Sequence, residues 1–177
     1  MNIFLLGYRC SGKTSVGKFL AGRLDWSFVD TDEELVQESG LSITDFVSKQ
    51  GWDAFRQMEK TVIKRVSDLD DHVIATGGGA VVDIENVKHM KRNGILVWLK
   101  ADAEAVKKRM LQDKSSGDFR PALTSKEAVD EIEEMLSIRN PYYEKAMAFA
   151  VDTNFIDVDE ICEVILRNLN ELGYSLC

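Results

Sequence analysis

The sequence predicts an α/β protein in which a parallel sheet is covered by helices on both faces. Short apolar segments alternate with longer amphipathic ones along all 177 residues, and no repeat or linker interrupts them. The apolar segments also lack the polar–apolar alternation of strands that have one face in water. Strands of a parallel sheet have this pattern, because helices bury both of their faces. A chain of this length is typical of one domain, so we expect a single three-layer domain over residues 1–177.

Five short apolar segments are the expected strands, and they lie at residues 2–6, 26–29, 72–75, 95–99 and 148–151. The first three are followed by chemically unusual residues, which begin at Gly7, Asp30 and Gly77. In parallel sheets, ligands bind beyond the carboxyl ends of the strands. We therefore expect these three segments to converge on one functional edge.

Longer amphipathic segments are the expected helices, at residues 13–24, 52–69, 84–94, 103–111 and 158–172. Thr31 and Glu34 have the spacing of a capping box, so a helical region is predicted from there to residue 69, with breaks at Gly40 and Gly51. Gly94 is expected to cap a helix at its carboxyl end. Residues 112–123 are polar and contain glycine, which is typical of a mobile lid loop. A further helix, starting near residues 124–127, is expected to end at Arg139.

Composition excludes several classes of function. The net charge is −8, and nucleic acids and anionic membranes are bound through basic surfaces, so we expect neither as a partner. Cys10, Cys162 and Cys177 have no metal-ligand spacing and do not indicate a disulfide framework. The amino-terminal residues lack a basic region, and their apolar run is too short for a signal peptide or a membrane span. A cytoplasmic monomer is expected.

The segment after the first strand matches the phosphate-binding P-loop. It consists of Gly7, Tyr8, Arg9, Cys10, Ser11, Gly12, Lys13 and Thr14, and Ser15 follows in the predicted helix. Glycines let backbone N–H groups surround phosphate oxygens, and the helix amino terminus adds positive charge. Lys13 would reach the β- and γ-phosphates, and the Thr14 hydroxyl would bind Mg²⁺. The alternative is a glycine turn with an incidental lysine, but a strand before and a helix after favour the P-loop.

Asp30 and Asp32 lie where the second strand meets a helix. A kinase needs a carboxylate near Mg²⁺ and a group that orients the accepting hydroxyl. Two aspartates at this junction can meet both needs while facing different directions. The alternative is that Asp32 only interacts with the helix dipole.

Three arginines and a triple glycine are weaker signals with ordinary alternatives. Arg56 and Glu59 share a helix face, either as a surface pair worth about 0–1 kcal/mol or as a guanidinium held ready for a carboxylate. Arg139 could complement a helix carboxyl terminus, and Arg120 could be a solvated loop residue. The glycines at 77–79 could form a tight turn, or they could leave room for a substrate against the backbone.

Taken together, these motifs make the chain resemble shikimate kinases along nearly its whole length. The matching motifs are Gly7 to Thr14, Asp30-Thr31-Asp32, Phe55-Arg56 with Glu59, Gly77-Gly78-Gly79, Phe119-Arg120-Pro121 and Arg139-Asn140-Pro141-Tyr142-Tyr143. The resemblance implies transfer of the ATP γ-phosphoryl group to the 3-hydroxyl of shikimate, with Mg²⁺ as cofactor, in aromatic amino-acid biosynthesis. It also implies the nucleoside monophosphate kinase-like fold, with strand order 2-3-1-4-5.

The resemblance further implies a role for individual residues. Asp32 would bind shikimate hydroxyls and is the candidate base, while Arg56 and Arg139 would bind the carboxylate. Gly77, Gly78 and Gly79 would line the ring. On the nucleotide side, Lys13 and Arg120 would contact the phosphates, Thr14 and Asp30 would bind Mg²⁺, and Arg109 and Asn154 would lie near adenine. Arg120 would belong to the lid.

Three residues depart from the family pattern. Cys10 stands where many members have glycine, Ala122 where a bulkier residue is common, and Trp52 where a small residue is expected. Two rival functions stay open on the residues alone: a kinase for another small acceptor, such as gluconate or a nucleoside monophosphate, and a catalytically silent nucleotide-binding relative. A nucleotide acceptor would need a purine site, which an acid and two separated arginines fit poorly.

Overall fold

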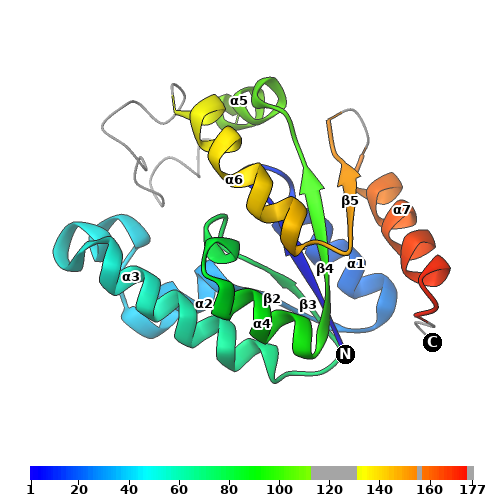
Figure 1. Cartoon of the computed structure of the whole chain (residues 1–177), viewed down its shortest axis with the longest axis horizontal. Coiled ribbons are helices and arrows are strands. Elements are labelled where there is room, and N and C mark those ends of the chain that lie inside the picture. The colour runs from blue at the N-terminus through cyan, green and yellow to red at the C-terminus, as the bar shows by residue number, and fades with distance from the viewer. Residues whose placement is uncertain (113–130, 155–156, 175–177) are drawn as a thin grey trace.

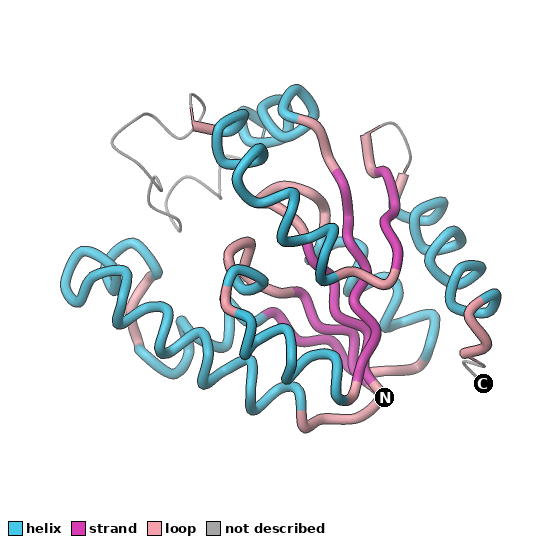
Figure 2. The backbone as a smooth tube through the Cα atoms, in the orientation of Figure 1, coloured by secondary structure: helices cyan, strands magenta, loops and turns pink. Residues whose placement is uncertain are grey.

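The structure is a computed structural model that describes residues 1–112, 131–154 and 157–174. Its centre is a five-stranded sheet in which every pair of neighbouring strands is parallel (Figure 2). The strands are β1 (Asn2–Leu6), β2 (Ser27–Asp30), β3 (His72–Ala75), β4 (Gly94–Lys100) and β5 (Phe149–Asp152). Their order is β2-β3-β1-β4-β5, which confirms the predicted architecture.

Helices cover both faces of this sheet (Figure 1). They are α1 (Lys13–Leu24), α2 (Thr31–Ser39), α3 (Ile43–Ser67), the short 3₁₀ helix η1 (Ala80–Val82), α4 (Ile84–Arg92), α5 (Ala103–Gln112), α6 (Ile132–Ala146) and α7 (Val158–Glu171). One core cluster packs α2, α3, α4 and α6 against the sheet, and another packs α1 and α7 against the opposite face. Within the described ranges, no helix is both long and apolar enough to cross a membrane.

Alternate residues of the strands enter the two core clusters. Phe4 and Leu6 of β1 face the cluster of α3, α4 and α6, whereas Ile3 and Leu5 face that of α1 and α7, and all four are fully buried. Successive side chains of a strand point to opposite faces, so burial on both faces requires an unbroken apolar sequence. The continuous apolar runs therefore predicted the sheet correctly.

The predicted capping box at Thr31 is wrong. Asp30 is the N-cap of α2, and its Oδ1 accepts a hydrogen bond from the Asp32 N–H at 3.0 Å. Thr31 is the first residue inside the helix, and its Oγ1 accepts a hydrogen bond from the Gly77 N–H at 3.0 Å. The threonine therefore joins the ends of β2 and β3, a tertiary contact that local spacing does not reveal.

Two predicted helix ends are also wrong. Gly94 does not cap α4 but begins β4, where an added Cβ would lie 2.5 Å from the Phe4 ring, so the glycine is required by packing. Helix α6 continues past Arg139 and Pro141 to Ala146, because Tyr143 and Ala146 in its last turns are buried in the core. Tertiary packing thus outweighs the local tendency of proline to end a helix. The predicted break at Gly51 is confirmed, since this residue has φ 82° and ψ 169° inside α3.

Candidate active site

The P-loop predicted at residues 7–14 joins the end of β1 to the start of α1, and its conformation depends on glycine at two positions. Gly7 has φ 145°, and an added Cβ would lie 2.6 Å from both the Leu99 carbonyl oxygen and the Ser11 Oγ. Gly12, the N-cap of α1, has φ 95°. Cys10 occupies the left-handed region with φ 57°, a conformation that a side chain tolerates only at some energetic cost. The cysteine that departs from the family pattern therefore still adopts the conformation that glycine favours.

Lys13 is buried beneath this loop, with 7% of its surface exposed. Its Nζ donates hydrogen bonds to the carbonyl oxygens of Gly7 at 2.9 Å and Tyr8 at 2.7 Å. The ammonium group is thus held against the curve of the loop, at the place where the motif requires a phosphate-binding charge. Ser15, in the first turn of α1, is exposed.

Thr14 and Asp30 come together although they lie in different βα connections. The Thr14 hydroxyl donates to Asp30 Oδ2 at 2.9 Å, and the carboxylate has only 7% of its residue surface exposed. One aspartate oxygen therefore caps α2 while the other faces the end of the P-loop. A hydroxyl and a carboxylate are oxygen donors suited to Mg²⁺, which proteins commonly bind through one or two carboxylates together with substrate phosphates. The donor set fits the metal that the sequence implied.

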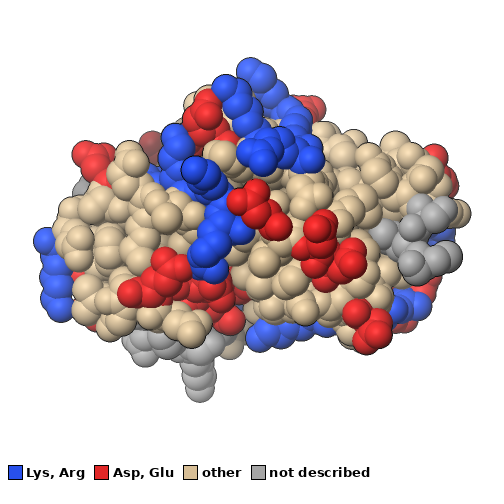
Figure 3. All heavy atoms as spheres, turned by 90° about the horizontal axis from the view of Figure 1, so that it is seen from below, with Lys and Arg blue, Asp and Glu red and all other residues tan. Residues whose placement is uncertain are grey.

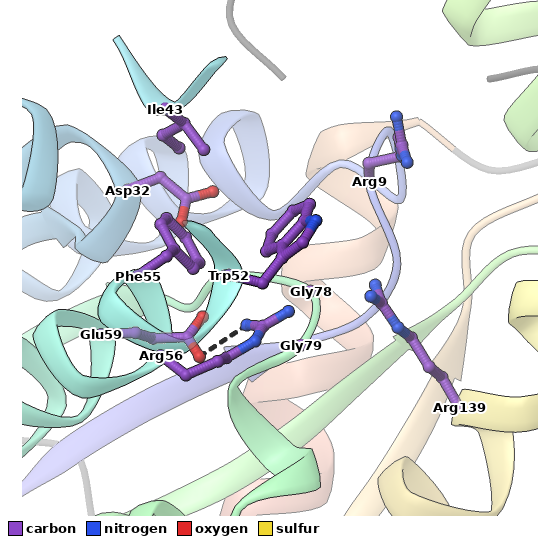
Figure 4. A pocket seen from close by; sticks show the side chains of 11 residues that line it. Arg9, Asp32, Ile43, Trp52, Phe55, Arg56, Glu59, Gly78, Gly79 and Arg139 are labelled. Carbon is purple, nitrogen blue, oxygen red and sulfur yellow. Dashed lines mark hydrogen bonds and ion pairs between the residues drawn. The ribbon is translucent and has the colours of Figure 1, made fainter. Parts of the chain in front are cut away.

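A cleft next to the P-loop brings together the acid, the arginines and the triple glycine (Figure 4). Its charged lining residues come from the P-loop, α2, α3 and α6, whereas β3 leads directly into the glycines. The lining consists of Arg9, Ile43, Trp52, Phe55, Asp32, Arg56, Glu59, Gly77, Gly78, Gly79 and Arg139. The structure thus places every acceptor residue expected from the sequence around a single cleft.

Each of the three glycines leaves room for a different charged group. A Cβ on Gly77 would lie 2.8 Å from both Asp32 Oδ1 and Glu59 Oε1. A Cβ on Gly79 would lie 2.5 Å from Arg56 Nη2, whereas one on Gly78 would lie 3.4 Å from Arg139 Nη1. The triple glycine is therefore not only a turn, because side chains at its first and third positions would displace the groups that form the cleft.

Arg56 and Glu59 form the ion pair that their spacing predicted, with Nη1 and Oε2 2.7 Å apart. Glu59 is buried, and burial raises the pKa of its carboxyl, an effect that the adjacent Arg56 guanidinium opposes. Arg56 also lies 5.5 Å from the Trp52 ring centroid and 5.2 Å from that of Phe55. These contacts hold the guanidinium in place, and Arg56 lines the wall of the cleft (Figure 4).

Arg139 lies in the middle of α6 and not at a helix end, so the alternative of a dipole contact at a carboxyl terminus is excluded. It is buried, with 7% exposed, and its guanidinium carbon lies 5.6 Å from the centroid of the Tyr8 ring. Tyr143, one helical turn further, donates a hydrogen bond from its hydroxyl to the Gly78 carbonyl oxygen. Burial raises the pKa of the Tyr143 phenol, which keeps this donor protonated. Helix α6 is thereby tied directly to the glycine turn.

Sequence reasoning missed two features of this cleft. Arg9 was expected only as a P-loop residue, but it lines the acceptor cleft and forms a 2.5 Å ion pair with the fully buried Glu131. Trp52 was noted only as a departure from the family pattern, but its ring packs against Arg56. An aromatic residue one helical turn before an arginine is the signal that could have suggested this contact.

The residues expected near adenine also come together. Arg109 Nη1 donates to the Cys10 carbonyl oxygen at 3.2 Å and to Thr153 Oγ1 at 3.3 Å. Asn154 Oδ1 accepts a hydrogen bond from the Asp102 N–H at 3.0 Å. The segments after β4 and β5 therefore meet the back of the P-loop. Arg120, Ala122 and the predicted lid beyond Gln112 lie outside the described residues.

Comparisons with a family model, with related sequences and with solved structures all match the chain to shikimate kinases. The family model described as shikimate kinase matches residues 9–170. Shikimate kinase 2 of Photorhabdus laumondii is 41% identical over 80% of this chain and 80% of its own length, and the shikimate kinase of Caldicellulosiruptor bescii is 39% identical over 93% of each chain. The structure of Acinetobacter baumannii shikimate kinase in complex with shikimate superposes with a TM-score of 0.89 at 30% identity, covering 98% of this chain and 95% of that one.

Proposed function

The chain belongs to the shikimate kinase family, and from that premise we propose which of its residues carry each part of the reaction. It is an ATP-dependent kinase that transfers the γ-phosphoryl group to the 3-hydroxyl of shikimate, giving shikimate 3-phosphate and ADP in chorismate and aromatic amino-acid biosynthesis. The extent of the match favours this acceptor over gluconate or a nucleoside monophosphate.

Arg56 and Arg139 bind the shikimate carboxylate in this proposal. Guanidinium groups bind carboxylates through paired, charge-assisted hydrogen bonds, and these two lie against different glycines of the turn, Arg56 against Gly79 and Arg139 against Gly78. Glu59 holds Arg56 by its ion pair, while Tyr8 lies beside Arg139. Their partners fix the arginines before substrate arrives, which lowers the entropic cost of binding.

Asp32 binds the shikimate hydroxyls and orients the 3-hydroxyl for attack. The carboxylate lies against Gly77, at the end of the cleft formed by α2 and α3. Asp32 lies two residues after Asp30, whose carboxylate accepts a hydrogen bond from the Thr14 hydroxyl. A hydroxyl bound by Asp32 would therefore lie near the Asp30 carboxylate at the end of the P-loop. As a base, Asp32 would accept the proton that leaves this hydroxyl.

Lys13 and the loop N–H groups stabilise charge on the transferring phosphoryl group. In phosphoryl transfer, catalysis is mostly positioning and charge neutralisation, so Lys13 contributes more than a strong base would. Arg120 is proposed as a second cation on the phosphates from its position in the family motif. If Arg120 acts mainly in the transition state, Arg120→Ala will lower kcat much more than it raises the KM for shikimate.

Thr14 and Asp30 are the proposed Mg²⁺ ligands, since their oxygens already lie together at the end of the P-loop. When bound there, Mg²⁺ would neutralise charge on the β- and γ-phosphate oxygens. Arg109 and Asn154 are proposed to lie beside the adenine ring, on the segments that meet behind the loop. We also propose that the enzyme acts as a cytoplasmic monomer, which sedimentation of the purified protein tests for oligomeric state.

One observation carries the proposal: Asp32, Arg56 and Arg139 reach a single cleft whose floor is glycine and whose edge is the P-loop. Losing one charged contact to a carboxylate costs about 1.5–3 kcal/mol, or roughly 10- to 100-fold in affinity. We therefore expect Arg139→Ala to raise the KM for shikimate by that factor and to leave the KM for ATP nearly unchanged. Arg167→Ala, an exposed arginine on α7, is the matched control. Equal rises in both KM values would remove Arg139 from the acceptor site.

A further inference from the structure

A second hollow, of about 620 Å³, lies between η1, α4 and α6. Val82, Ile84 and Tyr142 form apolar parts of its wall and are 47%, 56% and 42% exposed. Few large apolar side chains in the described part of the chain are this exposed, and three of them line one concave site. Concave sites of roughly 300–1,000 Å³ with apolar walls are typical of small-molecule binding.

Cations surround this apolar wall. Lys88, Lys91 and Arg92 of α4 and Lys145 of α6 all line the hollow, in a chain whose net charge is −8. Figure 3 shows the molecule from below relative to the view of Figure 1, and on this face Lys and Arg side chains gather in a group that has Asp and Glu side chains beside it. The charges of this rim are therefore opposite in sign to the charge of the protein as a whole.

Two of these cations have no acidic partner within the described residues. Lys88 pairs with Glu85 at 2.7 Å, and Arg92 lies 3.8 Å from Asp68. Among residues 1–112, 131–154 and 157–174, no carboxylate lies within ion-pair distance of Lys91 or Lys145. These two lysines can therefore interact with an anion without first breaking an ion pair described here.

We propose that this hollow binds a small amphipathic anion, with an apolar ring or chain against Val82, Ile84 and Tyr142 and its anionic group between Lys91 and Lys145. Charge complementarity favours this occupant over a second copy of the chain. A symmetric contact through the same face would bring the cations of one copy against those of the other. A neutral apolar molecule would use the wall but not the cations.

The hollow and the acceptor cleft are lined by two connected segments of the chain. Helix η1 follows Gly79 without a gap, and α6 carries Arg139 as well as Tyr142 and Lys145. A bound anion would therefore contact two segments that shape the acceptor cleft, and we expect it to change the KM for shikimate. That expectation rests on the acceptor assignment made above, whereas binding itself does not.

Binding is tested with 3-phenylpropionate, an apolar ring with a carboxylate, and its neutral amide, by isothermal titration calorimetry on the full chain. We expect the acid to bind with a Kd of roughly 0.1–1 mM and the amide to bind at least roughly tenfold more weakly. Nuclear magnetic resonance shifts should be centred on residues 80–92 and 142–146. No binding of the acid, or equal binding of acid and amide, would overturn the proposal.

Variants place the ligand within the hollow. The double variant Lys91→Ala with Lys145→Ala should lower the affinity for 3-phenylpropionate by roughly tenfold or more. Ile84→Asp should abolish binding, because its carboxylate would repel that of the ligand. The matched control, Lys49→Ala with Arg167→Ala, removes the same charge from exposed positions on α3 and α7 and should bind as the parent does. Equal loss in the control would assign the effect to net charge. Self-association in sedimentation that disappears in the Lys91 and Lys145 variant would also contradict the proposal, by making the face an interface between copies.

Discussion

The P-loop and the acceptor cleft share one edge of the sheet, but they are built in different ways. The P-loop is eight consecutive residues whose backbone conformation is fixed at Gly7 and Gly12. The acceptor cleft is lined by charged side chains from α2, α3 and α6 and by Arg9 of the loop, and these meet around the glycine turn after β3. A change at Lys13 should therefore affect phosphoryl transfer to any acceptor, whereas a change at Asp32, Arg56 or Arg139 should affect recognition of shikimate.

Replacing Lys13 gives the largest expected effect, and this effect is on phosphoryl transfer and not on recognition of shikimate. Removing one group that stabilises transition-state charge typically costs 10²- to 10³-fold in kcat, so Lys13→Ala should lower kcat by at least about this factor. Its KM for shikimate should change much less. Lys18→Ala, on the same helix but exposed, is the control. Steady-state kinetics on both variants, with circular dichroism to confirm folding, provide the measurement, and near-normal turnover by Lys13→Ala would refute the P-loop role.

Replacing Gly79 should affect the acceptor cleft. A Cβ there would lie 2.5 Å from Arg56 Nη2, so Gly79→Ala should displace the guanidinium and raise the KM for shikimate roughly 10-fold or more. The KM for ATP should stay close to that of the parent. A similar change in the KM for both substrates would show that the glycine turn serves the whole site and not the acceptor alone.

Gly22→Ala is the matched control for this substitution. Gly22 lies on the exposed face of α1, and an added Cβ would meet no atom within 4 Å. Alanine should therefore stabilise the helix by about 0.5–1 kcal/mol without altering either KM. Denaturant unfolding and kinetics on the same preparation separate the two glycines.

The sequence predicts these two regions unequally, for a physical reason. The P-loop is local: its glycines, Lys13 and Thr14 are recognisable from spacing because consecutive backbone groups perform the binding. The strands were also predicted within a residue or two, since burial on both faces requires continuous apolar runs. In contrast, Thr31 and Gly94 were misassigned because each is determined by a partner far along the chain, at Gly77 and Phe4.

Within the acceptor cleft, the sequence identified the charged residues but not their supports. Arg56 and Glu59 could be paired from helical spacing alone. The Arg9–Glu131 ion pair joins residues far apart in sequence, and the contact of Tyr143 with Gly78 depends on α6 continuing past a proline. Such contacts follow from how helices pack, so only the structure reveals them.

Glu59 gives the smallest expected effect, a change in how stability depends on pH. Burial raises the pKa of this carboxyl above its value in the unfolded chain. The folded state therefore binds the proton more readily, and the contribution of Glu59 to stability is present at low pH and is lost as pH rises through the folded-state pKa. Glu59→Gln removes that titration. The free energy of unfolding of the variant relative to the parent should rise as pH increases from about 4.5 upward. Denaturant unfolding at several pH values measures the difference, and a difference that falls with pH would contradict the assignment.

Binding of the shikimate carboxylate by Arg139 is tested by a cycle of one protein change and one substrate change. The KM is measured for shikimate and for its methyl ester, with the parent enzyme and with Arg139→Ala. If guanidinium and carboxylate interact, each single change should raise KM by roughly 10- to 100-fold, and the two changes together should cost little more than either alone. If the ester raises KM by the same factor in Arg139→Ala as in the parent enzyme, the two effects are independent. Arg139 then does not bind the carboxylate, and the proposed acceptor cleft is wrong.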